Sequence, residues 1–392
     1  MTLPQGFLGA SADAGIRKKR APDVALIVAE SGANAAAVFT RNRFQAAPVQ
    51  IAKRSLTKSG GRVRAVVVNA GCANAITGRA GHDAARRVQR RAAELLGCRP
   101  EEVFPASTGV IGVVLPDEKL SAALPEAIAA LSPDGLEAVS RAILTTDSGP
   151  KVAEATFLFG GVTRRLSGFC KGAGMIHPDM ATMLAFLLTD AALTPAALKT
   201  ALREAVDVSF NAISVDGDTS TNDTVLLLSS GKGKRAPSKA DSNSFRVALQ
   251  GVCKALARMI ARDGEGATRL MALEVRGARS RRDARLAANA IATSPLVKTA
   301  LFGGDPNWGR ILAALGRSGA RFSPAKVSLR VGPLTLVADG EPVPYEERDA
   351  AAVFAQEEVP IVVDLGEGGE SATVLASDLS HGYVTLNADY RS

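Results

Sequence analysis

Short apolar runs of strand length alternate along this chain with longer stretches of helical periodicity. One apolar run covers residues 66–68, and a helix is predicted over about residues 82–96, ending at Gly97. Such alternation predicts an α/β or α+β fold. Aromatic residues make up only 4% of the chain, so the core must consist mainly of Ala, Val, Leu and Ile.

Two helices and a loop are predicted in the middle of the chain. Thr194 suits an N-cap and Pro195 suits the first helical position, which predicts a helix through about residue 208. Residues 231–244 are mostly polar and have glycines at positions 231 and 233, so we expect an exposed loop there. Apolar residues then recur at helical spacing over residues 245–262, which predicts the second helix.

The pattern changes in the last third of the chain. Residues 270–275 and 327–331 alternate like strands, and residues 361–365 form another strand-like run. The length of 392 residues suits two or three domains of roughly 150 residues each. We therefore predict a larger domain over residues 1–270 and a smaller α/β domain over residues 271–392.

Composition and charge argue against membrane and nucleic-acid partners. No apolar run approaches the ~20 residues that a membrane span needs. The N-terminal charges follow the apolar residues, which is the wrong order for a secretory signal, and Asp13 interrupts the acid-free pattern of a transit peptide. The net charge of +8 is modest, and its basic clusters are not interleaved with aromatic residues that stack on bases. We expect a cytoplasmic enzyme.

Cysteine and histidine spacing gives no metal or redox motif. The four cysteines lie far apart without a C-x-x-C pair, and the three histidines have no H-x-x-x-H or H-x-x-E-H spacing. The phosphate-binding pattern G-x-x-x-x-G-K-[ST] is also missing. We therefore expect no metal and no bound cofactor.

Four glycine-rich polar segments have residue types too specific for simple scaffold. They are residues 107–112, 171–184, 263–268 and 305–310. Glycine lets a backbone adopt unusual geometry and come close to a ligand. We expect the chemistry of the protein to lie in these segments.

Thr182 ends a glycine-rich stretch and precedes the apolar run at residues 183–188. A threonine hydroxyl is a weak nucleophile that needs an adjacent base. Cutting the bond between Ala181 and Thr182 supplies one, because the new α-amino group titrates near ~7.7–8.0. The hydroxyl can attack the Ala181 carbonyl, convert the amide into an ester, and let water complete the cut. The alternative is an ordinary β-branched residue at the edge of a strand.

Residues 107–109 can meet the other requirement of acyl transfer. A tetrahedral oxyanion needs preorganised N–H donors. The glycine at position 109 permits the backbone geometry that points successive amides at one spot. The alternative for this segment is a plain turn after Pro105.

Other chemical residues in these segments allow two interpretations each. Lys171 is either a charged surface residue or an electrostatic partner in the site. Glu265, between two glycines, is either a solvated acid or faces a cationic amine. Cys170 as a nucleophile would need His177 and Asp179, but Pro178 stiffens that stretch and near neighbours in sequence rarely converge in this way.

Taken together, the ordered motifs resemble the ornithine acetyltransferase, or ArgJ, family of glutamate N-acetyltransferases. The resemblance covers essentially the full length of the chain. It is carried by residues 3–7, 69–75, 107–112, 145–147, 171–184, 209–211, 216–223, 263–268, 304–310 and 386–392. So many motifs in one order make this match far more specific than any single motif.

The resemblance implies a set of site residues. It implies self-cleavage between Ala181 and Thr182, with Thr182 as the nucleophile of the mature enzyme. Thr108 and Gly109 match the oxyanion positions of the family. The positions that contact substrate in the family fall on Thr146, Lys171, Thr182, Glu265, Asn387 and Ser392.

The implied fold is similar to that of self-processing aminopeptidases of the DmpA type, with packed sheets covered by helices. The implied reaction transfers acetyl from N-acetylornithine to glutamate through an acetyl-threonine enzyme, and some members also use acetyl-CoA as donor. The implied assembly holds two copies of each fragment. Two residues depart from the family pattern near the cut: Ala173 replaces the usual Ser, and Asp179 replaces the usual Asn.

Two other functions stay open at this point. A self-processing amidase or aminopeptidase would use the same nucleophile with water as the acceptor. A non-catalytic amino-acid-binding protein would use the same glycine-rich segments as a pocket.

Overall fold

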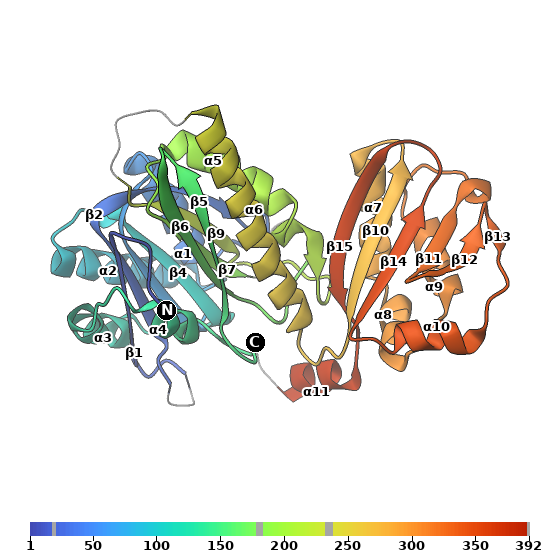
Figure 1. Ribbon diagram of the computed structural model, residues 1–392. Coiled ribbons are helices and arrows are strands. Elements are labelled where there is room, and N and C mark those ends of the chain that lie inside the picture. Colours follow the sequence, from blue (N-terminus) through green and yellow to red (C-terminus); the bar gives the residue numbers. More distant parts are fainter. Residues whose placement is uncertain (18–20, 178–182, 232–237, 390–392) are drawn as a thin grey trace.

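The structure is a computed structural model that describes residues 1–17, 21–177, 183–231 and 238–389. Its strands form two sheets that lie side by side, each covered by helices (Figure 1). This mixed architecture confirms the predicted α/β fold class with packed sheets covered by helices.

The first sheet contains eight strands. They are β1 (Phe7–Ala12), β2 (Val24–Phe39), β3 (Arg62–Cys72), β4 (Val103–Val110), β5 (Lys151–Phe159), β6 (Val162–Lys171), β7 (Leu184–Thr189) and β9 (Thr224–Ser229). Their order is β4-β3-β2-β9-β7-β6-β5, with β1 paired to β2. Strands β3 and β4 run parallel, as do β7 and β9. The long strand β2 pairs with β1, β3 and β9, so it joins the two halves of the sheet.

Side chains of β7 alternate between two hydrophobic cores, as strand geometry requires. Leu184, Phe186 and Leu188 pack into a central core together with one face of β2 and β3. Ala185 and Leu187 belong to a different core on the opposite face of the strand. The strand therefore reads as a continuous apolar run because both of its faces are buried.

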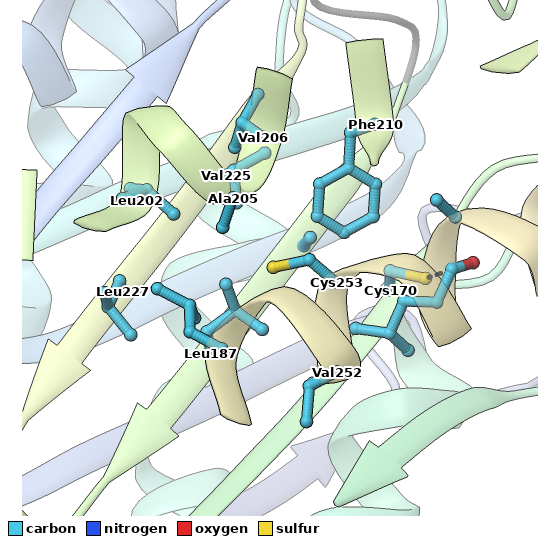
Figure 2. Packing of buried hydrophobic residues seen from close by; sticks show 14 of the residues in the cluster. Cys170, Leu187, Leu202, Ala205, Val206, Phe210, Val225, Leu227, Val252 and Cys253 are labelled. Carbon is cyan, nitrogen blue, oxygen red and sulfur yellow. Dashed lines mark hydrogen bonds between the residues drawn. The ribbon is translucent and has the colours of Figure 1, made fainter. Parts of the chain in front are cut away.

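Six helices of the described residues pack against this sheet, of which α4 contributes to the central core. They are α1 (Ala47–Lys58), α2 (Gly78–Leu96), α3 (Asp117–Ala129), α4 (Leu136–Ala142), α5 (Pro195–Asp207) and α6 (Lys239–Arg262), with one 3₁₀ turn η1 (Pro100–Glu102). Helices α2 and α3 share a core with β2, β3 and β4, whereas α5 and α6 cover β6, β7 and β9. Figure 2 shows Leu187 of β7 and Phe210 packed with Cys253 of α6 in this core. The two halves of the first sheet therefore enclose the central core, with α2 and α3 outside one half and α5 and α6 outside the other.

The second sheet contains seven strands in the order β13-β12-β11-β14-β10-β15-β8. These are β8 (Ile213–Ser214), β10 (Leu270–Ala278), β11 (Ser328–Val331), β12 (Leu334–Ala338), β13 (Glu341–Pro342), β14 (Glu358–Asp364) and β15 (Glu370–Ser377). Its helices and 3₁₀ turns are η2 (Phe210–Ala212), α7 (Arg281–Ala292), α8 (Pro295–Gly303), α9 (Trp308–Gly316), η3 (Pro324–Lys326), α10 (Glu347–Phe354) and α11 (His381–Asp389). Because β8 precedes β9 in the chain, the second sheet takes one short strand from the region before residue 270. The predicted domain boundary at this residue stays a prediction.

Capping residues set the helix ends largely as predicted. The Thr194 side chain accepts a hydrogen bond from the Ala197 N–H at 3.3 Å, and α5 begins at Pro195. Helix α2 ends at Leu96, and Gly97 follows in the left-handed conformation with φ of 61°. Glycine adopts this conformation without the steric cost that a side chain adds.

The predicted loop at residues 231–244 is wrong in its second half. Helix α6 begins at Lys239, six residues before the predicted start at Phe245. Ser238 accepts a hydrogen bond from the Asp241 N–H at 3.0 Å, and the Asp241 carboxylate accepts one from the Ser238 N–H at 3.1 Å. This reciprocal capping box starts the helix before its first buried residue, so the polar first turns resembled a loop.

No helix in the described residues has both the length and the apolar character to cross a membrane.

Candidate active site

A cavity of about 260 Å³ lies where segments from distant parts of the chain meet. It brings together six of the predicted site residues, namely Thr108, Gly109, Thr146, Lys171, Glu265 and Asn387. Ala181, Thr182 and Ser392, as well as Asp179, fall outside the described residues. Their predicted roles, like those of the six residues in the cavity, stay predictions.

Thr108 and Gly109 lie at the end of β4 rather than in a turn, so the alternative interpretation of this segment is wrong. Gly109 pairs in register with Gly71 of β3 and has a φ of 130°. A Cβ at this position would lie 2.3 Å from the Gly71 carbonyl carbon and 2.5 Å from the Cys72 nitrogen. Only glycine allows this close approach of β4 to β3.

Asn222 ties the ends of β3 and β4 together. Its side-chain amide donates hydrogen bonds to the Ala73 carbonyl at 2.7 Å and to the Ser107 carbonyl at 2.8 Å. The Ser107 hydroxyl in turn donates to Asn69 Oδ1 at 2.6 Å. These buried bonds fix the backbone on which Thr108 is presented to the cavity.

Lys171 ends β6 and is buried, so its interpretation as a surface residue is wrong. Its ammonium donates a hydrogen bond to the Thr108 hydroxyl at 3.2 Å. Burial lowers the pKa of Lys171, while the nearby carboxylates of Asp147 and Glu265 favour its charged form. The result is a buried basic group directly beside Thr108.

A buried ion-pair network lies behind Lys171. Asp147 accepts a hydrogen bond from Lys151 Nζ at 2.7 Å and another from the Gly172 N–H at 2.7 Å. Lys151 Nζ also contacts Asp263 Oδ2 at 2.5 Å. Burial alone would raise the pKa of Asp147, but the charges of Lys171 and Lys151 outweigh this and lower it to about 2. The carboxylate is therefore ionised at neutral pH.

Glu265 faces the cavity, which excludes its interpretation as a purely solvated loop acid. Asn387 of α11 donates a hydrogen bond to Glu265 Oε2 at 2.9 Å. Gly174 leaves room for this carboxylate, because a Cβ there would lie 2.4 Å from Glu265 Oε2. The carboxylate can thus present its remaining lone pairs to a cationic group in the cavity.

Sequence reasoning gave no individual role to Asp216, which also lines the cavity. Its carboxylate accepts hydrogen bonds from the Met175 N–H at 2.5 Å and the Ile176 N–H at 2.9 Å. Burial raises its pKa to about 6, although these backbone bonds favour the ionised form. The run of polar residues at 216–223 was the signal that could have singled it out.

The proposed grouping of Cys170, His177 and Asp179 is not supported by the described residues. Cys170 is fully buried in the apolar core shown in Figure 2, and burial raises the pKa of its thiol. His177 Nδ1 lies 3.3 Å from the Ser214 hydroxyl. Within the described ranges, no group of three or more His, Cys, Asp or Glu side chains could hold a metal ion.

Gly109→Ala is expected to destabilise the protein more than Gly112→Ala does. Both glycines have positive φ, but a Cβ at Gly112 meets no atom within 4 Å, whereas one at Gly109 meets the β3 backbone. The backbone strain alone costs roughly 1–3 kcal/mol at each position. Urea unfolding of the two variants measures the difference, and equal losses of stability would contradict the close-approach argument.

Asp147→Asn should change how stability depends on pH. The pKa of Asp147 is lowered from 3.8 to about 2, so its ionised form stabilises the fold above about pH 4, and this contribution is lost as the pH falls toward 2. The gap in free energy of unfolding between wild type and variant should narrow by about 2 kcal/mol over that interval. Urea unfolding between pH 7 and 2 measures it, and a constant gap would refute the ionised network.

Comparisons with known proteins identify relatives over the whole chain. A model of the ArgJ family matches residues 9–392. The chain is 49% identical over 397 residues to the arginine biosynthesis bifunctional protein ArgJ of Symbiobacterium thermophilum, covering 100% of this chain and 98% of that protein. The protein of the same name from Thermus thermophilus is 49% identical over 388 residues, covering 99% and 98%. A crystal structure of ArgJ from Bacillus halodurans is 40% identical with a TM-score of 0.50, covering 52% of this chain and 98% of that chain. The chain belongs to the ArgJ family.

Proposed function

We propose that this enzyme transfers an acetyl group from N-acetylornithine to glutamate in arginine biosynthesis, through an acetyl ester on Thr182. The observation that carries the proposal is the convergence of Thr108, Lys171 and Glu265 on one cavity beside the start of β7. Lys171 pairs in register with Leu184, which follows Thr182 by two residues. The names of the arginine-biosynthesis relatives support the same pathway.

The nucleophile is generated by self-cleavage. The Thr182 hydroxyl attacks the carbonyl carbon of Ala181, and the peptide C–N bond breaks as the nitrogen gains a proton. Water then hydrolyses the resulting ester, which releases a chain ending at Ala181 and one starting at Thr182. The new α-amino group titrates near ~7.7–8.0 and can act as the base for its own hydroxyl.

Acetyl transfer then proceeds in two steps on the same hydroxyl. Thr182 attacks the acetyl carbonyl of N-acetylornithine, ornithine leaves with a proton from the α-amino group, and the acetyl ester remains. The amine of glutamate attacks the carbonyl carbon of this ester, the bond from that carbon to the Thr182 oxygen breaks, and the α-amino group carries the proton lost by the amine back to this oxygen. N-acetylglutamate leaves and the Thr182 hydroxyl is restored. Each step passes through an oxyanion, for which we assign the backbone N–H groups at Thr108 and Gly109 as donors. Lys171, which donates to the Thr108 hydroxyl, adds a nearby positive charge.

Two charged side chains that line the cavity suit the two charges of an amino-acid substrate. The Glu265 carboxylate, held by Asn387, suits the side-chain ammonium of ornithine. The basic group of Lys171 suits a substrate carboxylate. Thr146 lines the same cavity, and Ser392 is expected to add a contact from the C-terminus.

Several further properties belong to the same proposal. Acetyl-CoA serves as a second acetyl donor, which would account for the word bifunctional in the names of the relatives. The enzyme uses no metal and no bound cofactor, because the α-amino group and the N–H donors supply the base and the oxyanion stabilisation. Two copies of each fragment assemble in the cytoplasm.

Intact mass after purification tests the nucleophile. Wild type should separate into residues 1–181 and 182–392, whereas Thr182→Ala should keep the mass of one full-length chain and lose turnover. Thr182→Ser is the matched control, because its hydroxyl retains the chemistry and should still allow cleavage. An active wild type with one unbroken chain would refute the proposal.

Ornithine release separates transfer from hydrolysis. Incubation of the cleaved enzyme with N-acetylornithine should release ornithine at a rate that depends on added glutamate, with N-acetylglutamate formed in equal amount. Release that is indifferent to glutamate would identify an amidase, with water as the acceptor. A non-catalytic binding protein would release no ornithine in either case.

A further inference from the structure

We propose that Asp216 and Asp223 are positioning residues for self-cleavage, which hold the chain on both sides of the bond between residues 181 and 182. Both lie in the 215–223 loop, which connects β8 to β9. The inference rests on the proposed self-cleavage and identifies how the fold prepares the chain for it.

Asp216 holds the chain before the scissile bond. Its two carboxylate oxygens accept hydrogen bonds from the Met175 N–H at 2.5 Å and the Ile176 N–H at 2.9 Å. The Ile176 carbonyl accepts a further bond from the Val215 N–H at 2.8 Å. Met175 has a φ of 57°, a left-handed conformation that a residue with a long side chain rarely adopts without external support. Asp216 supplies that support.

Asp223 holds the chain after the scissile bond. Its Oδ1 accepts a hydrogen bond from the Met183 N–H at 3.0 Å, and the Met183 carbonyl accepts one from the Thr224 N–H at 3.0 Å. Asp223 is fully buried, which raises its pKa well above the usual value, while hydrogen bonds from the Met183 N–H and from the Thr40 and Ser220 side chains favour its ionised form. Met183 directly follows residue 182, so this hydrogen bond holds the chain one residue after the scissile bond.

Asp216 and Asp223 belong to one loop, which further hydrogen bonds fix in place. The loop is closed by the Asp218 N–H, which donates to Asp216 Oδ1 at 3.2 Å. Next to Asp223, Asn222 binds the ends of β3 and β4 through its side-chain amide. The same loop therefore fixes the flanks of the scissile segment and the strand end that carries Thr108.

Fixing the chain on both sides of the scissile bond favours the attack of the Thr182 hydroxyl on the carbonyl carbon of Ala181. The reaction requires the two groups to meet in a narrow range of geometries, and restricting the ends of the segment reduces the conformations that must be searched. The carboxylate of Asp216, whose pKa is about 6, is mostly ionised at neutral pH and is a stronger acceptor of backbone N–H bonds than the amide oxygen of asparagine. At Asp223, asparagine would replace one buried carboxyl oxygen with an NH₂ donor. Loss of either carboxylate should slow cleavage without removing any reacting atom.

The test follows cleavage over time by intact mass in freshly purified full-length chains. Asp216→Asn and Asp223→Asn are each expected to cleave at least tenfold more slowly than wild type. Asp283→Asn is the matched control, because Asp283 is also a buried carboxylate that accepts a backbone bond, from the Arg321 N–H at 3.2 Å, but lies on α7, which packs against the second sheet. The control should cleave within twofold of wild type, and cleavage of both test variants at the control rate would overturn the inference.

Chemical rescue separates positioning from general damage to the fold. Asp216 lines the cavity, so added formate can enter the space left by Asp216→Ala and accept the same backbone bonds. Cleavage of this variant should accelerate with formate and not with chloride, and no acceleration would count against a positioning role. These two Asp216 variants also carry the test if Asp223→Asn fails to fold. Wild type that never cleaves would instead refute the proposed function itself.

Discussion

The buried ammonium of Lys171 is the charge around which the candidate site is arranged. Moving a charged group out of water is costly, and it is tolerated only where opposite charges and hydrogen bonds surround it. Asp147 and Glu265 supply the opposite charge, and the Thr108 hydroxyl accepts a hydrogen bond at 3.2 Å. Lys171 and these three partners come from four separate segments, so the site can form only when those segments are brought together by the fold.

The layered architecture explains how these segments meet. Strand β2 runs through both halves of the first sheet, and the central core packs between them. This arrangement brings the end of β4, which carries Thr108, near the end of β6, which carries Lys171. Gly109 permits the close approach of β4 to β3, because any side chain at this position would collide with the β3 backbone. A rigid double layer thus sets the geometry on which an oxyanion site depends.

Local sequence signals predicted the elements whose ends are set by single residues. Thr194, Pro195 and Gly97 gave the limits of α5 and α2, because caps and left-handed glycines act within one turn. The early start of α6 was missed because its first turns are polar and are held by a capping box at Ser238. Hydrophobic periodicity appears only where one face of a helix is buried, and the first turns of α6 are not buried.

The candidate site was predictable only in part, for a different physical reason. Glycine-rich segments indicated Thr108, Lys171 and Glu265, because their residue types serve no ordinary scaffold role. The ion pair of Lys151 with Asp263 was not predicted, since 112 residues separate the two along the chain. Periodicity and spacing carry no record of such long-range pairs. The position of Asn387 beside Glu265 was likewise suggested only by the family resemblance.

The contact between Asn387 and Glu265 also gives the second sheet a role in the chemistry. Helix α11 follows β15 and lies against the loop at residues 263–268, where the Ser380 hydroxyl donates to the Gly266 carbonyl at 2.5 Å. A Cβ on Gly266 would lie 2.3 Å from the Tyr383 nitrogen, so the start of α11 is packed directly on this loop. The side chain of Glu265 is therefore oriented by α11, which follows the strand β15 of the second sheet, whereas Thr108 and Lys171 lie on strands of the first sheet. Under the proposed function, the carboxylate that binds the substrate amine is thus held by α11, and the groups that take part in acyl transfer are held by the first sheet. A change in the second sheet can alter substrate preference while the reacting groups keep their positions.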